Sequence, residues 1–274
     1  RYHHQRLARV SDPSLLAELA AVDPLRRRTA LERLASTTAP LDGAAVAAVV
    51  ACLATPLTAV QRRAADVLSR VEAEARPLVA ARLRAAIGSD DPRLRWGATY
   101  ALGRLGIVEP AMIAPLLEAL GQRDGGQRWA AADLMTTCAR AHPDLVMAAL
   151  LGAVADHEPE RRKMVLYVLR AVAPTSLAVR DATIRSLRDP AVGVRFAALS
   201  ALARLDPLPP EACTLVLALV RDDPDAGFRR AALGALGHVG RGVSAALAAL
   251  ETAVTSDDPG IRRAAQLARR RLAE

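Results

Sequence analysis

An arginine that is followed three residues later by a small residue returns eight times along this 274-residue chain. The intervals between successive arginines are 35, 33, 33, 34, 33, 34 and 33 residues. We call them the column arginines: Arg27, Arg62, Arg95, Arg128, Arg162, Arg195, Arg229 and Arg262. The small residues are Ala30, Ala65, Ala98, Ala131, Val165, Ala198, Ala232 and Ala265. A fixed period of this length is typical of arrays in which each repeat buries its apolar face against its neighbours.

The residues before each column arginine predict the start of a helix. Copies such as Asp91-Pro92 and Asp258-Pro259 place an Asp where it can cap free amides, and a Pro in the first turn, where no amide partner is lost. Asp124-Gly125 is a variant of the same turn. A second apolar helix precedes each of these helices, for example over 110–121, 144–156 and 209–221. Each repeat therefore reads as helix, turn, helix.

The composition places the whole chain in the all-α class. Hydrophobic residues make up 52% and aromatic residues only 3%, and no alternating run is long enough for a strand. We expect one domain over residues 1–274, a right-handed α-solenoid of about eight helix pairs. The expected repeats cover 11–36, 42–71, 74–105, 109–141, 143–172, 174–205, 209–239 and 242–274.

Copies such as residues 189–199, which run from Asp189-Pro190 through Arg195 to Leu199, resemble HEAT repeats. They are most similar to the short HEAT-like units of phycobilin lyase subunits and prokaryotic scaffold proteins. The resemblance implies that the column arginine bonds to an Asp or to helix-end carbonyls of the adjoining unit. It also leaves a bilin-lyase role as a minor alternative, because one array of this kind serves many functions.

The formal net charge of +8 favours an acidic or nucleic-acid partner. Lys163 is the only lysine, however, so the balance reflects a general preference for arginine. Since eight arginines belong to the column that the resemblance marks as structural, we read most of the charge as structural arginine and solvated surface.

A helical wheel of the second helix of each repeat selects the candidate binding positions. With the column arginine at 0° and about 100° per residue, the residues one and five places later lie on the side away from the apolar face. In solenoids of helix pairs, we expect this side to line the concave groove. The first column is Arg28, Arg63, Trp96, Trp129, Lys163, Phe196, Arg230 and Arg263. The second column is Glu32, Val67, Tyr100, Asp133, Tyr167, Ser200, Gly234 and Leu267.

Five of the seven aromatic residues of the chain fall in these two columns. We therefore predict a protein or peptide partner, an acidic one, bound by an aromatic centre with basic margins. The candidate contacts are Trp96, Tyr100, Arg104, Trp129, Asp133, Lys163, Tyr167, Arg170 and Phe196. The open alternative is that the aromatic side chains fill gaps between alanine-rich repeats.

Nucleic acid is the alternative partner, since aromatic rings and arginines also bind bases and phosphates. HEAT-like alkylpurine DNA glycosylases carry Trp residues and an Asp in their groove, and Trp129 and Asp133 lie one helical turn apart. The match is partial, because Trp129 follows a column arginine. Stabilisation of a sugar cation by Asp133 is the enzymatic alternative.

Other chemistry finds no support in the sequence. The three cysteines are isolated, the histidines are scattered, and there is no phosphate-binding glycine loop. We expect no cofactor, no metal, no catalytic residue and no membrane span, and the unpaired cysteines favour the cytoplasm.

Overall fold

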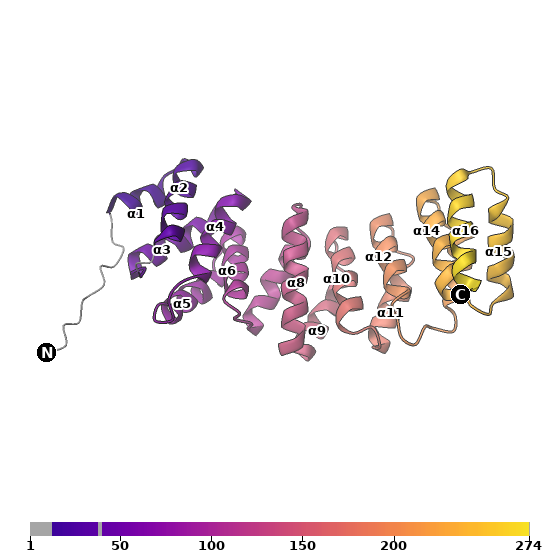
Figure 1. Ribbon diagram of the computed structural model, residues 1–274. Coiled ribbons are helices and arrows are strands. Elements are labelled where there is room, and N and C mark those ends of the chain that lie inside the picture. Colours follow the sequence, from indigo (N-terminus) through magenta and orange to yellow (C-terminus); the bar gives the residue numbers. More distant parts are fainter. Residues whose placement is uncertain (1–12, 38–39, 274) are drawn as a thin grey trace. The chain divides into compact units, whose positions relative to one another are not determined.

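The structure, a computed structural model, describes residues 13–37 and 40–273. Within these ranges the chain forms sixteen α-helices and no strand (Figure 1). The first helices of the pairs are α1 (Pro13–Ala20), α3 (Gly43–Ala51), α5 (Arg76–Ile87), α7 (Ile113–Leu120), α9 (Pro143–Ala153), α11 (Leu177–Ser186), α13 (Ala212–Asp222) and α15 (Ser244–Val254). The second helices are α2 (Pro24–Ser36), α4 (Thr58–Ser69), α6 (Pro92–Arg104), α8 (Gly125–Ala141), α10 (Pro159–Val172), α12 (Val192–Leu202), α14 (Ala226–Val239) and α16 (Pro259–Ala273). Two short 3-10 turns, η1 (Cys52–Ala54) and η2 (Pro110–Met112), complete the secondary structure.

Three second helices, α2, α6 and α16, begin at the proline of an Asp-Pro, as the sequence predicts, whereas α12 and α14 begin two residues after that proline. The side chain of Asp91 accepts a hydrogen bond from the amide of Arg93, and that of Asp225 accepts one from Phe228. These bonds satisfy amides that have no partner inside the helix. Proline occupies the first turn of α2, α6 and α10.

The small residues of the repeat lie at the centre of the packing. All eight of them, from Ala30 to Ala265, are 0% exposed. Helices of the same kind pack against each other in sequence order: α2 on α4, α4 on α6, α10 on α12, α12 on α14 and α14 on α16. A small side chain at this position allows the close helix approach that the array requires.

The chain divides into two compact units. The first contains the residues up to Ala119 together with Asp133–His142, and the second contains Leu120–Ala132 together with the residues from Pro143 onward. Helix α8 contributes its first half to the second unit and its second half to the first. The helix pairs fall inside the predicted repeat ranges, although residues 11, 12 and 274 lie outside the described part. The organisation as a single domain stays a prediction.

Candidate functional site

The column arginines cap the turn of their own repeat. Seven of them donate a side-chain hydrogen bond to the carbonyl oxygen six residues earlier: Arg27, Arg95, Arg128, Arg162, Arg195, Arg229 and Arg262. In all but Arg27, the same guanidinium nitrogen also bonds the next carbonyl. These carbonyls follow the first helix of the pair, so each arginine closes the link between the two helices.

Four column arginines also reach an acidic residue of the following repeat. The closest nitrogen–oxygen distances are 2.8 Å for Arg95–Glu118, 3.3 Å for Arg128–Glu160, 2.8 Å for Arg162–Asp189 and 2.8 Å for Arg195–Asp223. In the last pair, the side chains are only 8% and 3% exposed. The structural role that the resemblance implies for Arg95, Arg128 and Arg195 is thereby confirmed, although the carbonyls belong to the arginine's own repeat and the acidic partner is an Asp only for Arg195. Their charges are not available to an external ligand.

The two columns of the second helices are mostly accessible, with two exceptions. Among their sixteen residues only Trp96 and Val67 are buried, at 7% and 5% exposure. The expectation that Trp96 faces water is therefore wrong. The wheel places a side chain about the axis of its own helix, but its exposure is decided by what packs over it. Trp96 lies against Tyr100, with the ring centroids 5.7 Å apart.

In the first unit, the candidate basic residue is already paired. Arg104 approaches Asp66 on α4 to 3.0 Å. Tyr100 is half-buried beside Trp96. This part of the predicted site thus offers one partly exposed aromatic side chain and a neutralised arginine.

In the second unit, three candidate residues form what we call the aromatic stack. Trp129 on α8 is 52% exposed, and its ring lies 5.5 Å from that of Tyr167 on α10, at an interplanar angle of 21°. The guanidinium carbon of Arg170, one turn later on α10, lies 4.8 Å from the centroid of the Tyr167 ring. Arg170 also donates a hydrogen bond to the hydroxyl of Ser200 on α12. The exposed indole therefore packs on the Tyr167 ring, and Arg170 contacts that same Tyr167 ring.

Lys163 lies on the same helix but has a partner of its own. Its ammonium group lies 2.7 and 2.8 Å from the two carboxylate oxygens of Glu160, and Glu160 also pairs with Arg128. One carboxylate thus balances two cations beside the aromatic stack. The charge of Lys163 is therefore already paired within the protein.

Phe196 on α12 is the second exposed aromatic residue of this unit. It is 37% exposed and meets Phe228 of α14 edge to face, with ring centroids 5.2 Å apart and an interplanar angle of 88°. Phe228 is 0% exposed, and the guanidinium carbon of Arg195 lies 5.3 Å from its ring centroid. Phe196 therefore packs on a fully buried ring.

Comparison with known proteins agrees with this repeat geometry. The sequence model for HEAT repeats matches residues 147–237 and 181–269. The chain is a HEAT-like repeat solenoid. The predicted all-α solenoid class and the resemblance to HEAT repeats are both confirmed.

Solved structures with the same fold include a bacterial protein of similar length. This HEAT-like chain resembles YibA of Escherichia coli at 16% identity and a TM-score of 0.56, over 95% of this chain and 93% of YibA. It also resembles Kap95p, solved in work on RanGDP, at 15% identity and a TM-score of 0.57, over 93% of this chain and 37% of Kap95p. For Kap121p the identity is 10% and the TM-score 0.56, over 94% of this chain and 37% of that one. No curated protein matches in sequence. At these identities the likeness shows the fold alone.

Asp133, the acidic residue of the enzymatic alternative, lies on the surface of this HEAT-like array. It belongs to the first unit and is exposed on α8. Its backbone carbonyl accepts a hydrogen bond from Thr137. A carboxylate stabilises a developing cation most strongly where water is excluded, and the position of Asp133 does not provide such a setting.

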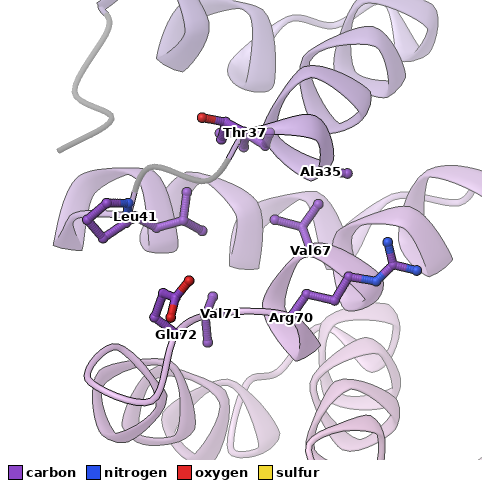
Figure 2. A pocket seen from close by; sticks show the side chains of 9 residues that line it. Ala35, Thr37, Leu41, Val67, Arg70, Val71 and Glu72 are labelled. Carbon is purple, nitrogen blue, oxygen red and sulfur yellow. The ribbon is translucent and has the colours of Figure 1, made fainter. Parts of the chain in front are cut away.

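A small pocket lies elsewhere, at the C-terminal ends of α2 and α4 in the first unit (Figure 2). Its volume is about 250 Å³, and Val67 is the one member of the two columns among its lining residues. Figure 2 shows Leu41, Val67 and Val71 around it, with Arg70 and Glu72. The pocket was not predicted from the sequence, because it depends on how the ends of two repeats meet.

The remaining reactive groups of the described residues are scattered or buried. No group of three or more His, Cys, Asp or Glu side chains within the described ranges could hold a metal ion. Burial raises the pKa of the Cys52 thiol to about 11, although the charge of Arg27 acts in the opposite direction. Cys52 is therefore a poor nucleophile at neutral pH. No helix in the described part of the chain is long and apolar enough to cross a membrane.

Proposed function

We propose that this HEAT-like protein is a non-enzymatic scaffold that binds a protein or peptide over the second helices of its second unit. The observation that carries the proposal is the aromatic stack, in which Trp129 is half-exposed yet packed on Tyr167, whose ring also contacts Arg170. An exposed tryptophan ring gains free energy when a partner covers it. Because the ring of Trp129 already packs on Tyr167, the site loses little conformational entropy when a partner binds.

Phe196 on α12 supplies a second anchor in the same unit, two repeats after Trp129 on α8. Tryptophan and tyrosine are among the residue types that dominate the energy of protein interfaces. In the first unit, Tyr100 stays a candidate contact, with Trp96 as its packed neighbour. Asp133 stays a candidate polar contact on α8, without a catalytic role.

A protein partner is compatible with this fold. Kap95p binding acts on the switch loops of RanGDP, so an array of this kind can serve protein recognition. We also place the protein in the cytoplasm, since Cys52, Cys138 and Cys213 are buried free thiols.

The test is the selection of binding peptides from a random phage-display library, followed by affinity measurements on protein variants that each change one surface. The site variant is Trp129→Ala with Phe196→Ala. The control variant is Leu145→Ala with Leu177→Ala, which removes apolar side chains of 53% and 67% exposure from α9 and α11 of the same unit. Peptides selected on the wild type should bind the control equally well and the site variant at least about tenfold more weakly.

Equal binding of the selected peptides to all three proteins would show that the aromatic surface is not the site. A parallel titration measures the affinity for duplex DNA, intact and alkylated, and tests whether the ligand is a nucleic acid. In that case affinity would fall steeply between about 50 and 200 mM salt, because binding releases counterions.

A further inference from the structure

Charge is unevenly distributed in the second unit. Helices α10, α12, α14 and α16 together contain twelve arginine and lysine residues and one acidic residue, Glu160. The acidic residues near them lie in the turns, such as Asp189 and Asp223, where they cap helices or pair with column arginines. The second helices of this unit are therefore strongly basic.

Most of these cations are engaged inside the protein. The column arginines bond turn carbonyls, Arg161 pairs with Asp156, Lys163 pairs with Glu160, and Arg170 lies over Tyr167. Five exposed arginines of these helices make no ion pair with any described residue: Arg230, Arg263, Arg269, Arg270 and Arg271. All five belong to α14 and α16, and Arg271 also lies 3.3 Å from the Nε2 atom of His238.

The repeat register places three of the five, Arg230, Arg263 and Arg270, on the face of the aromatic stack. Arg230 and Arg263 are the first-column residues of their repeats, the position held by Trp129 and Phe196. Arg270 follows its column arginine by eight residues, as Arg170 does, and eight residues bring a helix back near the direction of the first column.

Close packing of α14 and α16 fixes this basic part of the face. A Cβ atom at Gly237 of α14 would lie 2.9 Å from the backbone of Ala268 of α16. The guanidinium of Arg230 lies beside Gly260 at the start of α16. The face of the second unit is thus aromatic over α8 to α12 and basic over α14 and α16.

We infer that the partner of this face is an extended acidic peptide, with apolar side chains on Trp129 and Phe196 and carboxylates on Arg230, Arg263 and Arg270. This inference rests on the proposed function and assigns the acid-selecting role to residues other than Lys163 and Arg104. Arginine suits the role, because its planar guanidinium binds a carboxylate through two parallel hydrogen bonds.

The spacing of the exposed rings favours a peptide over a single-stranded nucleic acid. Packed helices lie about 8–10 Å apart, so Trp129 on α8 and Phe196 on α12 are separated by roughly 16–20 Å. An extended peptide covers about 3.3 Å per residue and spans that distance in five or six residues. Single strands stack successive bases on aromatic side chains, whereas the two most exposed rings of this unit lie two helix spacings apart. The acidic residues of the peptide should follow the second anchor at intervals of about three residues.

The inference is tested by the composition of peptides selected from a random library about sixteen residues long, enough to cross four helix spacings. The selection uses the full chain, as wild type and with Arg230→Gln, Arg263→Gln and Arg270→Gln combined. The matched control combines Arg123→Gln, Arg185→Gln and Arg188→Gln, which removes the same charge from exposed positions of the same unit outside the second helices. Far-UV circular dichroism and the thermal midpoint establish that each variant folds.

Peptides from the wild type and the control should be rich in Asp and Glu, and should bind the Arg230/Arg263/Arg270 variant about tenfold more weakly. Neutral or basic peptides that still depend on Trp129 and Phe196 would overturn the inference and leave the proposed function standing. Selected peptides whose binding does not depend on Trp129 and Phe196 would overturn both the inference and the proposed function. Preferential binding of a single-stranded oligothymidylate through the same three arginines, with no acidic peptide selected, would assign the face to nucleic acid and overturn the inference.

Discussion

Trp96 and Trp129 occupy the same position of two successive repeats, yet they are 7% and 52% exposed. The repeat period correctly identifies the position, but it treats all repeats as equal. Exposure depends on the side chains around each ring, as with Trp96 against Tyr100. The same limit applies to Lys163, because its partner Glu160 lies outside the two columns from which the site was predicted. Residue identity at a column position therefore predicts a candidate and not its accessibility.

This contrast between the two tryptophans gives a direct prediction for solution measurements. A Trp96→Phe variant retains only Trp129, and a Trp129→Phe variant retains only Trp96. Acrylamide should quench the fluorescence of the first variant several-fold more strongly than that of the second, since the indole of Trp129 is half-exposed. Equal quenching of both variants would contradict the geometry of the aromatic stack.

The buried pair Arg195–Asp223 should be the most sensitive link of the arginine column. Removal of one partner leaves the other charge buried without compensation, so Arg195→Ala should lower the free energy of unfolding by about 3 kcal/mol. Arg221→Ala breaks a pair whose side chains are 76% and 59% exposed and should leave stability nearly unchanged. Urea denaturation measures both variants. A similar effect in the two would argue against a special role of the column.

Asp189 should make stability depend on acid pH. Burial alone would raise the pKa of its carboxyl group, but hydrogen bonds from Arg162 and the Ala191 amide hold the pKa below its ordinary 3.8. A lowered pKa adds stability above the unfolded value, and this stability is lost as the pH falls through the folded value. The stability difference between wild type and Asp189→Asn should therefore be constant above about pH 5 and shrink as the pH falls below it toward about pH 2, through the lowered folded value. A constant difference in urea denaturation across this range would contradict the assignment.

At the scale of the helix, most of the structure was predictable from local signals. Asp91 and Asp225 cap the helices that they precede, and the small residues of the repeat are fully buried, as a periodic array requires. The acidic partners of the column arginines were not identified, because the distances in sequence vary from 23 residues for Glu118 to 32 for Glu160. The identity of such a partner depends on the packing geometry between one repeat and the next.

Two glycines of α14 allow the effect of helix propensity on stability to be measured apart from the effect of helix packing. A Cβ at Gly234 meets nothing within 4 Å, so Gly234→Ala should stabilise the protein by about 0.5–1 kcal/mol. A Cβ at Gly237 would press on the backbone of Ala268, so Gly237→Ala should destabilise it by about 1–3 kcal/mol. Thermal midpoints of the two variants test this difference. A gain in both would show that α14 and α16 are not in such close contact.

At the scale of the whole molecule, the sequence period is sufficient to predict the array, because stacked repeats interact mainly with their neighbours. The site is harder to predict, since it depends on which side chains remain unpaired after the repeats stack. Arg104 and Lys163 are neutralised within the protein, whereas Arg230 and Arg263 remain free of ion pairs with the described residues. The proposed binding face therefore extends further toward α16 than the aromatic residues alone predict.

The most direct test of the central claim is ¹⁹F NMR of the protein labelled with 5-fluorotryptophan. The chain contains two tryptophans, so two resonances are expected, and the Trp96→Phe variant assigns them. On addition of a peptide selected on the wild type, the Trp129 resonance should shift and that of buried Trp96 should stay in place. A peptide that binds at saturation without moving the Trp129 resonance would contradict the assignment of the partner site to the aromatic stack.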